Sequence, residues 1–197
     1  MTFDADIHHR RSIRLRDYNY THAGAYFVTI CTFERECLFG TVMDGVVLLN
    51  DLGQIVANCW DDIPNHFPHV ELDAIAIMPN HLHGIIVLTD NVQPVSSTFG
   101  AIIRSLKSAV TKRINALNQG AGSWSVGSPH AAPDFDSARE NQGATCGAST
   151  RGGAVSSVWQ RNYYERIIRD ERELLQIRQY IIDNPLKWDE DENHPRP

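Results

Sequence analysis

The most constraining feature of this sequence is the apolar run over 70–90, VELDAIAIMPNHLHGIIVLTD. Aliphatic residues dominate it, and Pro79-Asn80 interrupts it. The run therefore predicts one strand on each side of a tight break. Further strands are expected over 25–33, 37–42 and 46–50, the last two joined by an Asp-Gly turn.

Apolar residues at a helical spacing predict the remaining elements. The clearest helix covers 171–183, because Asp170 suits its N-cap, Glu173 suits the capping box, and Asn184-Pro185 ends it. Strands outnumber possible crossover helices, which favours an antiparallel-rich α+β fold over a doubly wound parallel sheet. Other helical segments are expected over 51–67, 99–117 and 161–169.

The stretch over 118–156 differs in composition from the rest of the chain. It is rich in Gly, Ala, Ser and Thr and poor in core residues, so it predicts a flexible low-complexity insertion rather than a separate domain. The acidic tail over 189–197 is expected to be frayed. The sequence therefore predicts one domain over 1–188, interrupted by this insertion.

Composition narrows the class of protein. Hydrophobic residues make up 42% of the chain and charged residues 21%, which excludes global disorder. The net charge of −6 argues against a uniformly basic nucleic-acid surface but permits a local basic groove. No apolar window suits a membrane span or a signal peptide, and the four cysteines lack metal spacing, so we expect a cytoplasmic protein with free thiols. Two basic clusters stand out, Arg10, Arg11, Arg14 and Arg16 in one, and Arg104, Lys107, Lys112 and Arg113 in the other.

Two histidines begin the second strand of the apolar run. His81 and His83 are two residues apart, so both imidazoles lie on one face while Leu82 points to the other. Two neutral ring nitrogens on one face make half of a metal site. The alternative is a pair of histidines that cap a sheet edge, and the short His-x-His pattern alone leaves both interpretations open.

The last helix offers partners for such a site. Tyr180 and Asn184 are four residues apart, so they lie one turn apart on one helix face. An amide oxygen suits Mg²⁺ or Mn²⁺, and a tyrosine beside the ion can attack phosphorus. The alternatives are a core tyrosine and a helix stop before a proline. Tyr163 and Tyr164 are weaker candidate nucleophiles, because isoleucine follows each of them four residues later.

The blocks RSIRLRDYNYTHAGAYFVTICTFERECLFG, AIAIMPNHLHGIIVL and VWQRNYYERIIRDERELLQIRQYIIDNPLKW resemble the REP-associated tyrosine transposases, which are single-tyrosine HUH proteins. The resemblance implies a ferredoxin-like antiparallel sheet with helices on one face and the HUH motif on a central strand. It also implies that Tyr180 is catalytic and that His81, His83 and Asn184 bind a divalent metal, Mg²⁺ or Mn²⁺.

The activity implied by the resemblance is that of a metal-dependent single-stranded DNA endonuclease and strand transferase. Such an enzyme acts at DNA hairpins formed by REP-like palindromes, through a 5′-phosphotyrosine intermediate. We expect it to be a monomer or a homodimer and to have no membrane partner. Two alternatives stay open: a catalytically silent hairpin-binding protein, and a metal phosphoesterase that uses activated water. The basic clusters are expected to contact DNA phosphates, which would make binding salt-dependent.

Overall fold

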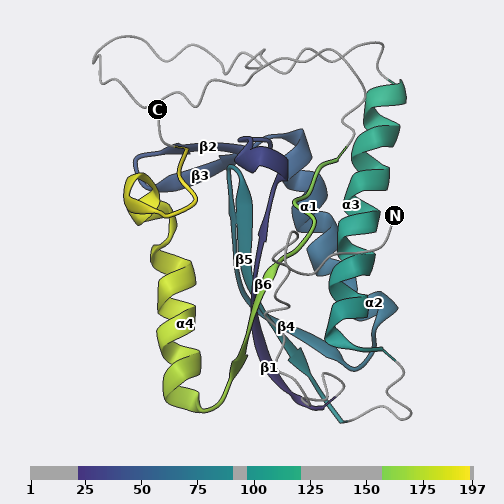
Figure 1. The fold of residues 1–197 in the computed structure, drawn as a ribbon, viewed down its shortest axis with the longest axis vertical. Coiled ribbons are helices and arrows are strands. Elements are labelled where there is room, and N and C mark those ends of the chain that lie inside the picture. The colour runs from purple at the N-terminus through teal and green to yellow at the C-terminus, as the bar shows by residue number, and fades with distance from the viewer. Residues whose placement is uncertain (1–21, 91–96, 121–156, 196–197) are drawn as a thin grey trace, which may run out of the picture.

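A computed structural model describes residues 22–90, 97–120 and 157–195 of the chain (Figure 1). Within these ranges no helix combines the length and the apolar character needed to cross a membrane. The elements are β1 (Gly24–Cys31), η1 (Phe33–Arg35), β2 (Gly40–Met43), β3 (Val46–Leu49), α1 (Asp51–Asp61), α2 (Ile63–His66), β4 (Val70–Met78), β5 (His81–Leu88), α3 (Phe99–Gly120), β6 (Tyr164–Ile168), α4 (Glu171–Asp183) and η2 (Pro185–Glu190).

The main sheet has the strand order β4-β5-β1-β6, and every neighbouring pair is antiparallel. Strand β5 therefore lies inside the sheet, with β4 on one side and β1 on the other. Its register places His83 opposite Thr29 and His81 opposite Cys31 on β1. The expected α+β class, the antiparallel sheet and the central position of the HUH strand are confirmed.

One face of the sheet carries α1 and α3 (Figure 1). Its core contains alternate residues of β5, such as Leu82 and Ile86, together with Trp60 of α1. Gly84 permits this packing, because a Cβ at this position would overlap the ring of Trp60. Helix α1 can therefore approach β5 closely at this point.

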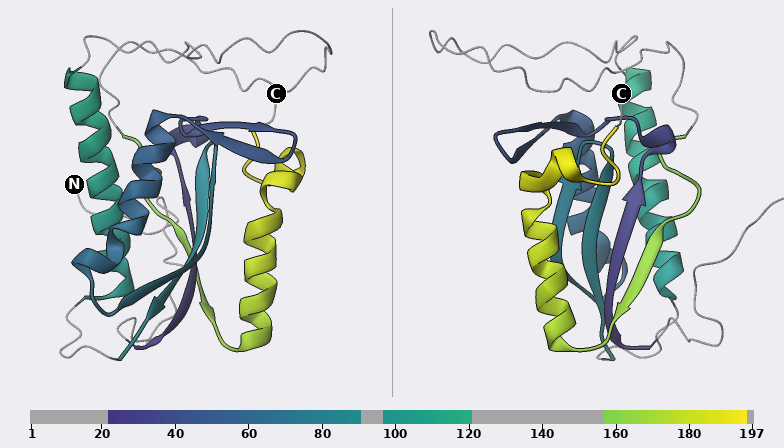
Figure 2. Two further views of the ribbon diagram at one scale, coloured as in Figure 1. Left: turned by 180° about the vertical axis from the view of Figure 1, so that it is seen from behind. Right: turned by 60° about the vertical axis from the view of Figure 1, so that its left-hand side comes forward.

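The opposite face carries α4 and η2, as the two views in Figure 2 show. Phe27 of β1 and Ile85 of β5 pack there with Ile181 and Trp188. The expectation that helices cover one face only is therefore wrong. The physical reason is that the interior strand β5 is apolar on both sides, so both of its faces require a cover.

Two other elements differ from the sequence-based expectation. The segment expected as a short helix over 161–169 contains strand β6, which pairs with β1 at the sheet edge. The segment RNYYERIIR mixes charged and apolar residues over too short a stretch to set a period, so pairing with an available strand decides its state. Helix α3 continues to Gly120, beyond the expected end at 117. The rest of the expected insertion, over 121–156, lies outside the described residues.

Local signals at α4 and at the β2–β3 hairpin are confirmed. The side chain of Asp170 caps α4 by accepting a hydrogen bond from the Glu173 amide at 2.8 Å. Glu173 in turn accepts from the Arg169 amide at 2.9 Å. Asp44 and Gly45 both have positive φ, as a tight hairpin turn requires. These contacts fix where α4 begins and hence where Tyr180 lies.

Candidate active site beneath helix α4

His81 and His83 lie on the face of β5 that α4 and η2 cover, in ring contact with Trp188 and Tyr180 respectively, and both side chains are buried. Their Nε2 atoms are 3.1 Å apart. Asn80 accepts from His81 Nδ1 through Oδ1 at 2.8 Å, because its Nδ2 donates to two backbone carbonyls. His81 Nδ1 therefore carries the proton, and its Nε2 keeps a lone pair that faces the second imidazole. Thr29 Oγ1 lies 2.8 Å from His83 Nδ1 and fixes that ring.

Burial keeps both imidazoles neutral. It lowers the pKa of His81 to about 4. Burial and the neighbouring His81 lower the pKa of His83 to about 3. A neutral imidazole is the form that binds a metal ion, so this pair stays competent as a ligand well below neutral pH.

Tyr180 projects from α4 toward the histidine pair, and its side chain stays partly exposed to solvent. Its Oη lies 3.2 Å from His83 Nε2, although 97 residues separate the two in the chain. The ring packs edge-on against Phe27 at a centroid distance of 6.1 Å. Burial, followed by the charges of Asp191 and Glu192, raises the pKa of Tyr180 to about 12. The phenol therefore keeps its proton at neutral pH, and its hydroxyl can donate a hydrogen bond to His83 Nε2.

Asn184 is buried at the C-terminus of α4, one turn after the tyrosine. Its Nδ2 donates to Asp191 Oδ2 at 2.9 Å. Its Oδ1 is buried and finds no hydrogen-bond partner among the described residues. The side chain lies against His81 and raises the pKa of that imidazole, which partly opposes the effect of burial. The structure thus brings together all of the catalytic and metal-site residues expected from the sequence, namely Tyr180, His81, His83 and Asn184.

Asp191 is the site residue that the sequence did not indicate. Its carboxylate and the ring nitrogens of His81 and His83 lie within 4.8 Å of one another, so this group can hold a metal ion. Burial opposes ionisation of Asp191, but hydrogen bonds from Asn193 and Asn184 outweigh it, and its pKa lies below the ordinary value. The residue therefore contributes a negative charge to the site.

The tail that contains Asp191 was expected to be frayed, and this expectation is wrong over 189–195. Asn193 is only 4% exposed, and its backbone carbonyl accepts from Asn80 Nδ2 at 2.7 Å. Trp188 packs its ring 6.0 Å from His81. An acidic run carries no periodic pattern that would predict packing. The tryptophan just before it, Trp188, was the one sequence signal that this segment packs against the sheet.

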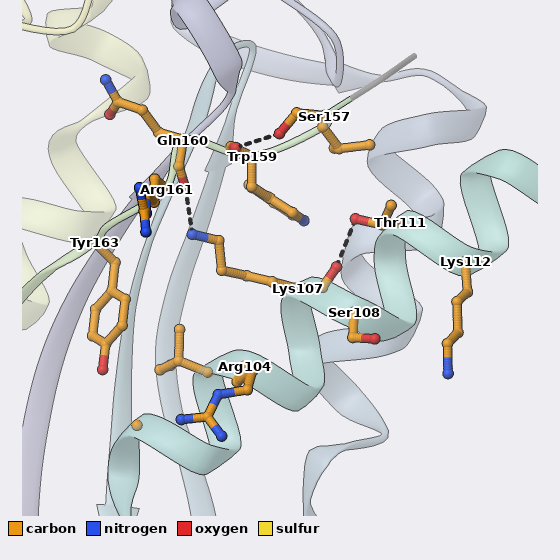
Figure 3. Close-up of a pocket in the computed structure, with 13 residues that line it drawn as sticks. Arg104, Lys107, Ser108, Thr111, Lys112, Ser157, Trp159, Gln160, Arg161 and Tyr163 are labelled. Atoms are coloured by element: carbon orange, nitrogen blue, oxygen red, sulfur yellow. Dashed lines mark hydrogen bonds between the residues drawn. The ribbon is translucent and has the colours of Figure 1, made fainter. Parts of the chain in front are cut away.

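A basic groove runs between α3 and the segment over 157–163 (Figure 3). Arg104, Lys107 and Lys112 line it from α3, and Arg161 lines it from the opposite side. Lys107 donates to the backbone carbonyls of Gln160 and Asn162 at 2.6 and 3.2 Å. Burial lowers the pKa of Lys107 to about 8. This lysine therefore anchors the segment that forms the opposite wall of the groove.

Arg113, the other member of the α3 cluster, does not line this groove. Arg113 forms an ion pair with Asp62 of the α1–α2 junction at 3.2 Å. The N-terminal arginines, Arg10, Arg11, Arg14 and Arg16, lie outside the described residues.

A second cavity of about 390 Å³ opens at Tyr180 and His83. Tyr163 and Tyr164 also line it, so the two weaker candidate nucleophiles lie at the mouth of the site. Gln160 and Tyr163 line both this cavity and the basic groove. The two hollows therefore adjoin, and an extended ligand can occupy both.

Comparisons with known proteins place the chain among relatives. No model of a known protein family matches it. An uncharacterized protein of Haemophilus influenzae (strain Rd) is 41% identical over 207 residues, which is 96% of each chain. A "Putative REP-associated tyrosine transposase" of the same organism is 24% identical over 169 residues, 86% of this chain and 74% of the relative.

Among solved structures, the chain is similar to a REP-associated tyrosine transposase that is bound to a REP hairpin. The TM-score is 0.54 at 18% identity, over 90% of this chain and 74% of the other. This likeness shows a shared fold. The resemblance indicated by the motifs is therefore confirmed: the chain belongs to one family with the 41%-identical Haemophilus influenzae protein and is a relative of the REP-associated tyrosine transposases.

Proposed function

We propose that this chain is a metal-dependent single-stranded DNA endonuclease and strand transferase that acts at hairpins through Tyr180. One observation carries the proposal: the Tyr180 hydroxyl lies 3.2 Å from a buried histidine pair that can hold a metal ion. A tyrosine beside a metal-bound phosphate is a suitable nucleophile for transesterification.

The donor set fits a divalent cation. His81 and His83 present neutral ring nitrogens, and Asn184 Oδ1 is a buried acceptor without a partner among the described residues. These are the side chains that would hold Mg²⁺ or Mn²⁺, with open positions left for phosphate oxygens. When bound, the ion would polarise the scissile phosphate and neutralise charge that develops on it.

Tyr180 supplies the nucleophilic oxygen. Its Oη forms a bond to phosphorus while the bond between phosphorus and the 3′ oxygen breaks. The phenolic proton passes to solvent in this step, and the leaving oxygen takes up a proton from solvent to become a 3′-hydroxyl. The products are a 5′-phosphotyrosine and a free 3′ end. The reverse reaction with another 3′-hydroxyl rejoins the strand, so transfer needs no external energy source.

The DNA lies along the basic groove next to this site. Arg104, Lys107 and Lys112 provide positive charge beside the Tyr180 cavity, and cationic side chains bind phosphates in a salt-dependent manner. We expect Arg10, Arg11, Arg14, Arg16 and Arg113 to contribute to the same field. The structural relative was solved with a REP hairpin, which supports a hairpin with a single-stranded flank as the substrate.

The test is a covalent-adduct assay. End-labelled single-stranded hairpins, taken from palindromes near the gene that encodes this chain, are incubated with the protein and Mn²⁺ and run on a denaturing gel. We expect a metal-dependent labelled protein band that disappears in Tyr180→Phe. Tyr164→Phe is the matched control, because this half-exposed tyrosine lines the same cavity and is expected to leave the adduct intact.

Other outcomes separate the alternatives. Nicking that persists in Tyr180→Phe would overturn the proposal. Cleavage without an adduct in the wild type would indicate a phosphoesterase that uses activated water. Hairpin binding on a native gel without cleavage or an adduct would indicate a silent binding protein.

A further inference from the structure

We propose that Asp191 is a positioning residue of the metal centre. Its carboxylate holds the Asn184 amide in the one orientation that presents Oδ1 to the ion. The inference rests on the proposed function, because it concerns the same metal site, and it assigns a role to the segment that follows η2.

The first argument concerns the amide itself. Its NH₂ group only donates and its oxygen only accepts. The Asn184 Nδ2 is 2.9 Å from Asp191 Oδ2. An ionised carboxylate oxygen has no proton to donate, so it acts only as an acceptor. A flipped amide would place two oxygens in contact and lose this bond. The carboxylate therefore leaves Oδ1 as the atom available for a ligand, and that oxygen has no partner among the described residues.

The second argument concerns what holds the carboxylate. The backbone N–H of Asn193 donates to Asp191 Oδ1 at 2.6 Å. The backbone carbonyl of Asn193 accepts from Asn80 Nδ2 at 2.7 Å. Asn80 in turn accepts from His81 Nδ1 at 2.8 Å. A continuous chain of contacts thus runs from His81 through Asn80, Asn193 and Asp191 to Asn184. Two of the three expected metal ligands are oriented by the same short segment.

A different role, that of a direct ligand, makes a different prediction. Both oxygens of Asp191 already accept hydrogen bonds, one from Asn184 and one from Asn193. A positioning residue needs an accepting oxygen in this place and does not need the negative charge. A direct anionic ligand needs the charge itself. The isosteric substitution Asp191→Asn separates the two roles, because its one oxygen can still accept from Asn184, while the charge and the second bond, from the Asn193 backbone, are lost.

The experiment measures Mn²⁺ binding to the full chain without DNA, by calorimetry or by the spectrum of free Mn²⁺. We expect Asp191→Ala to weaken binding about 10- to 100-fold, as changes around metal ligands do. Asp191→Asn is expected to stay within about threefold of the wild type, because the asparagine oxygen can still accept the hydrogen bond from Asn184 that orients the ligand. Glu190→Gln, an exposed neighbour, is the matched control and should bind like the wild type.

A double-variant cycle tests whether Asp191 acts through Asn184. In the Asn184→Ala background, Asp191→Ala should weaken Mn²⁺ binding no further. Unchanged binding in Asp191→Ala overturns the proposal, and so does equal weakening in Asp191→Asn and Asp191→Ala. If Asp191→Ala does not fold, Asp191→Ser replaces it, because a serine is too short to reach Asn184.

The readout also separates this inference from the proposed function. Tyr180→Phe should bind Mn²⁺ normally. Wild-type protein that binds Mn²⁺ and forms no DNA adduct would contradict the proposed transesterification and leave the role of Asp191 standing.

Discussion

The α1–α3 face of the sheet and the α4 face differ in what they bury. The first buries apolar side chains, with Leu82 and Ile86 as the contribution of β5. The second combines a smaller apolar cluster with two histidines, an asparagine and a carboxylate. Both faces use the same strand, and the alternation of its side chains assigns consecutive residues to opposite sides. Stability and chemistry are therefore separable by single substitutions one position apart.

The largest effect is expected on the α4 face. His81→Ala removes an expected metal ligand, and metal stabilisation of a phosphoryl transition state is worth several kcal/mol. Cleavage of a labelled hairpin should fall by about a thousandfold or more. Hairpin affinity should stay within about twofold, because phosphate contacts elsewhere supply it. Cleavage at the wild-type rate under limiting metal would refute the ligand assignment.

The neighbouring residue should show the opposite behaviour. Leu82 is fully buried on the α1–α3 face, and truncation of a buried leucine costs about 2–5 kcal/mol. Leu82→Ala should lower the free energy of unfolding in urea by this amount, while folded protein keeps its Mn²⁺ affinity. A loss of metal binding in folded Leu82→Ala would show that the two faces are coupled.

Acid should destabilise the α4 face in the metal-free protein. The folded-state pKa values of His81 and His83 are about 4 and 3, below the ordinary value of 6.5. At pH values between the folded-state pKa values and 6.5, the unfolded chain therefore binds more protons than the folded chain. The free energy of unfolding falls as the pH falls below 6.5. Between pH 6.5 and 5 we expect a loss of about 2–4 kcal/mol in urea titrations with a chelator. A pH slope that His83→Gln leaves unchanged would contradict this origin.

A smaller effect is expected in the basic groove at the edge of the α1–α3 face. Arg104 lines this groove, whereas Arg113 on the same helix is paired with Asp62. Arg104→Ala should weaken hairpin binding and reduce the logarithmic salt slope by about 0.7 to 0.9, as loss of one phosphate contact does. Arg113→Ala should change the slope less. A larger change in the salt slope for Arg113→Ala than for Arg104→Ala would place the DNA along another side of α3.

The smallest effect is expected from the insertion over 118–156. We propose that this stretch is an insertion within a single domain, because its composition cannot supply a core. Deletion of 122–154 should leave the midpoint of thermal unfolding unchanged. A collapsed transition would show that the segment belongs to the packed structure.

Local patterns made part of this structure predictable. The face shared by His81 and His83 follows from strand alternation, and the face shared by Tyr180 and Asn184 follows from helical spacing. The contact between Tyr180 and His83 joins residues 97 positions apart, so only the family resemblance indicated it. Periodicity within each element carries no information about which elements meet.

The errors also have physical causes. Strand β6 was expected as a helix because its short sequence, YERII, sets no clear period, and the edge of β1 selects the strand. Asp191 was missed because polar residues after a helix usually lie in solvent. Its place beside the histidines depends on Asn80 and Asn193, which tie the segment to the β4–β5 turn.

The order of the elements along the chain divides the two halves of the candidate site. All strands of the sheet, up to Ile168, precede Tyr180, Asn184 and Asp191 in the chain. A chain that is terminated before Tyr180 therefore carries the histidine pair and lacks the proposed nucleophile. It also lacks the end of α4 and all of η2, so Phe27 and Ile85 lose the cover that Ile181 and Trp188 provide. We therefore expect a chain truncated there to lose packing and the proposed chemistry together.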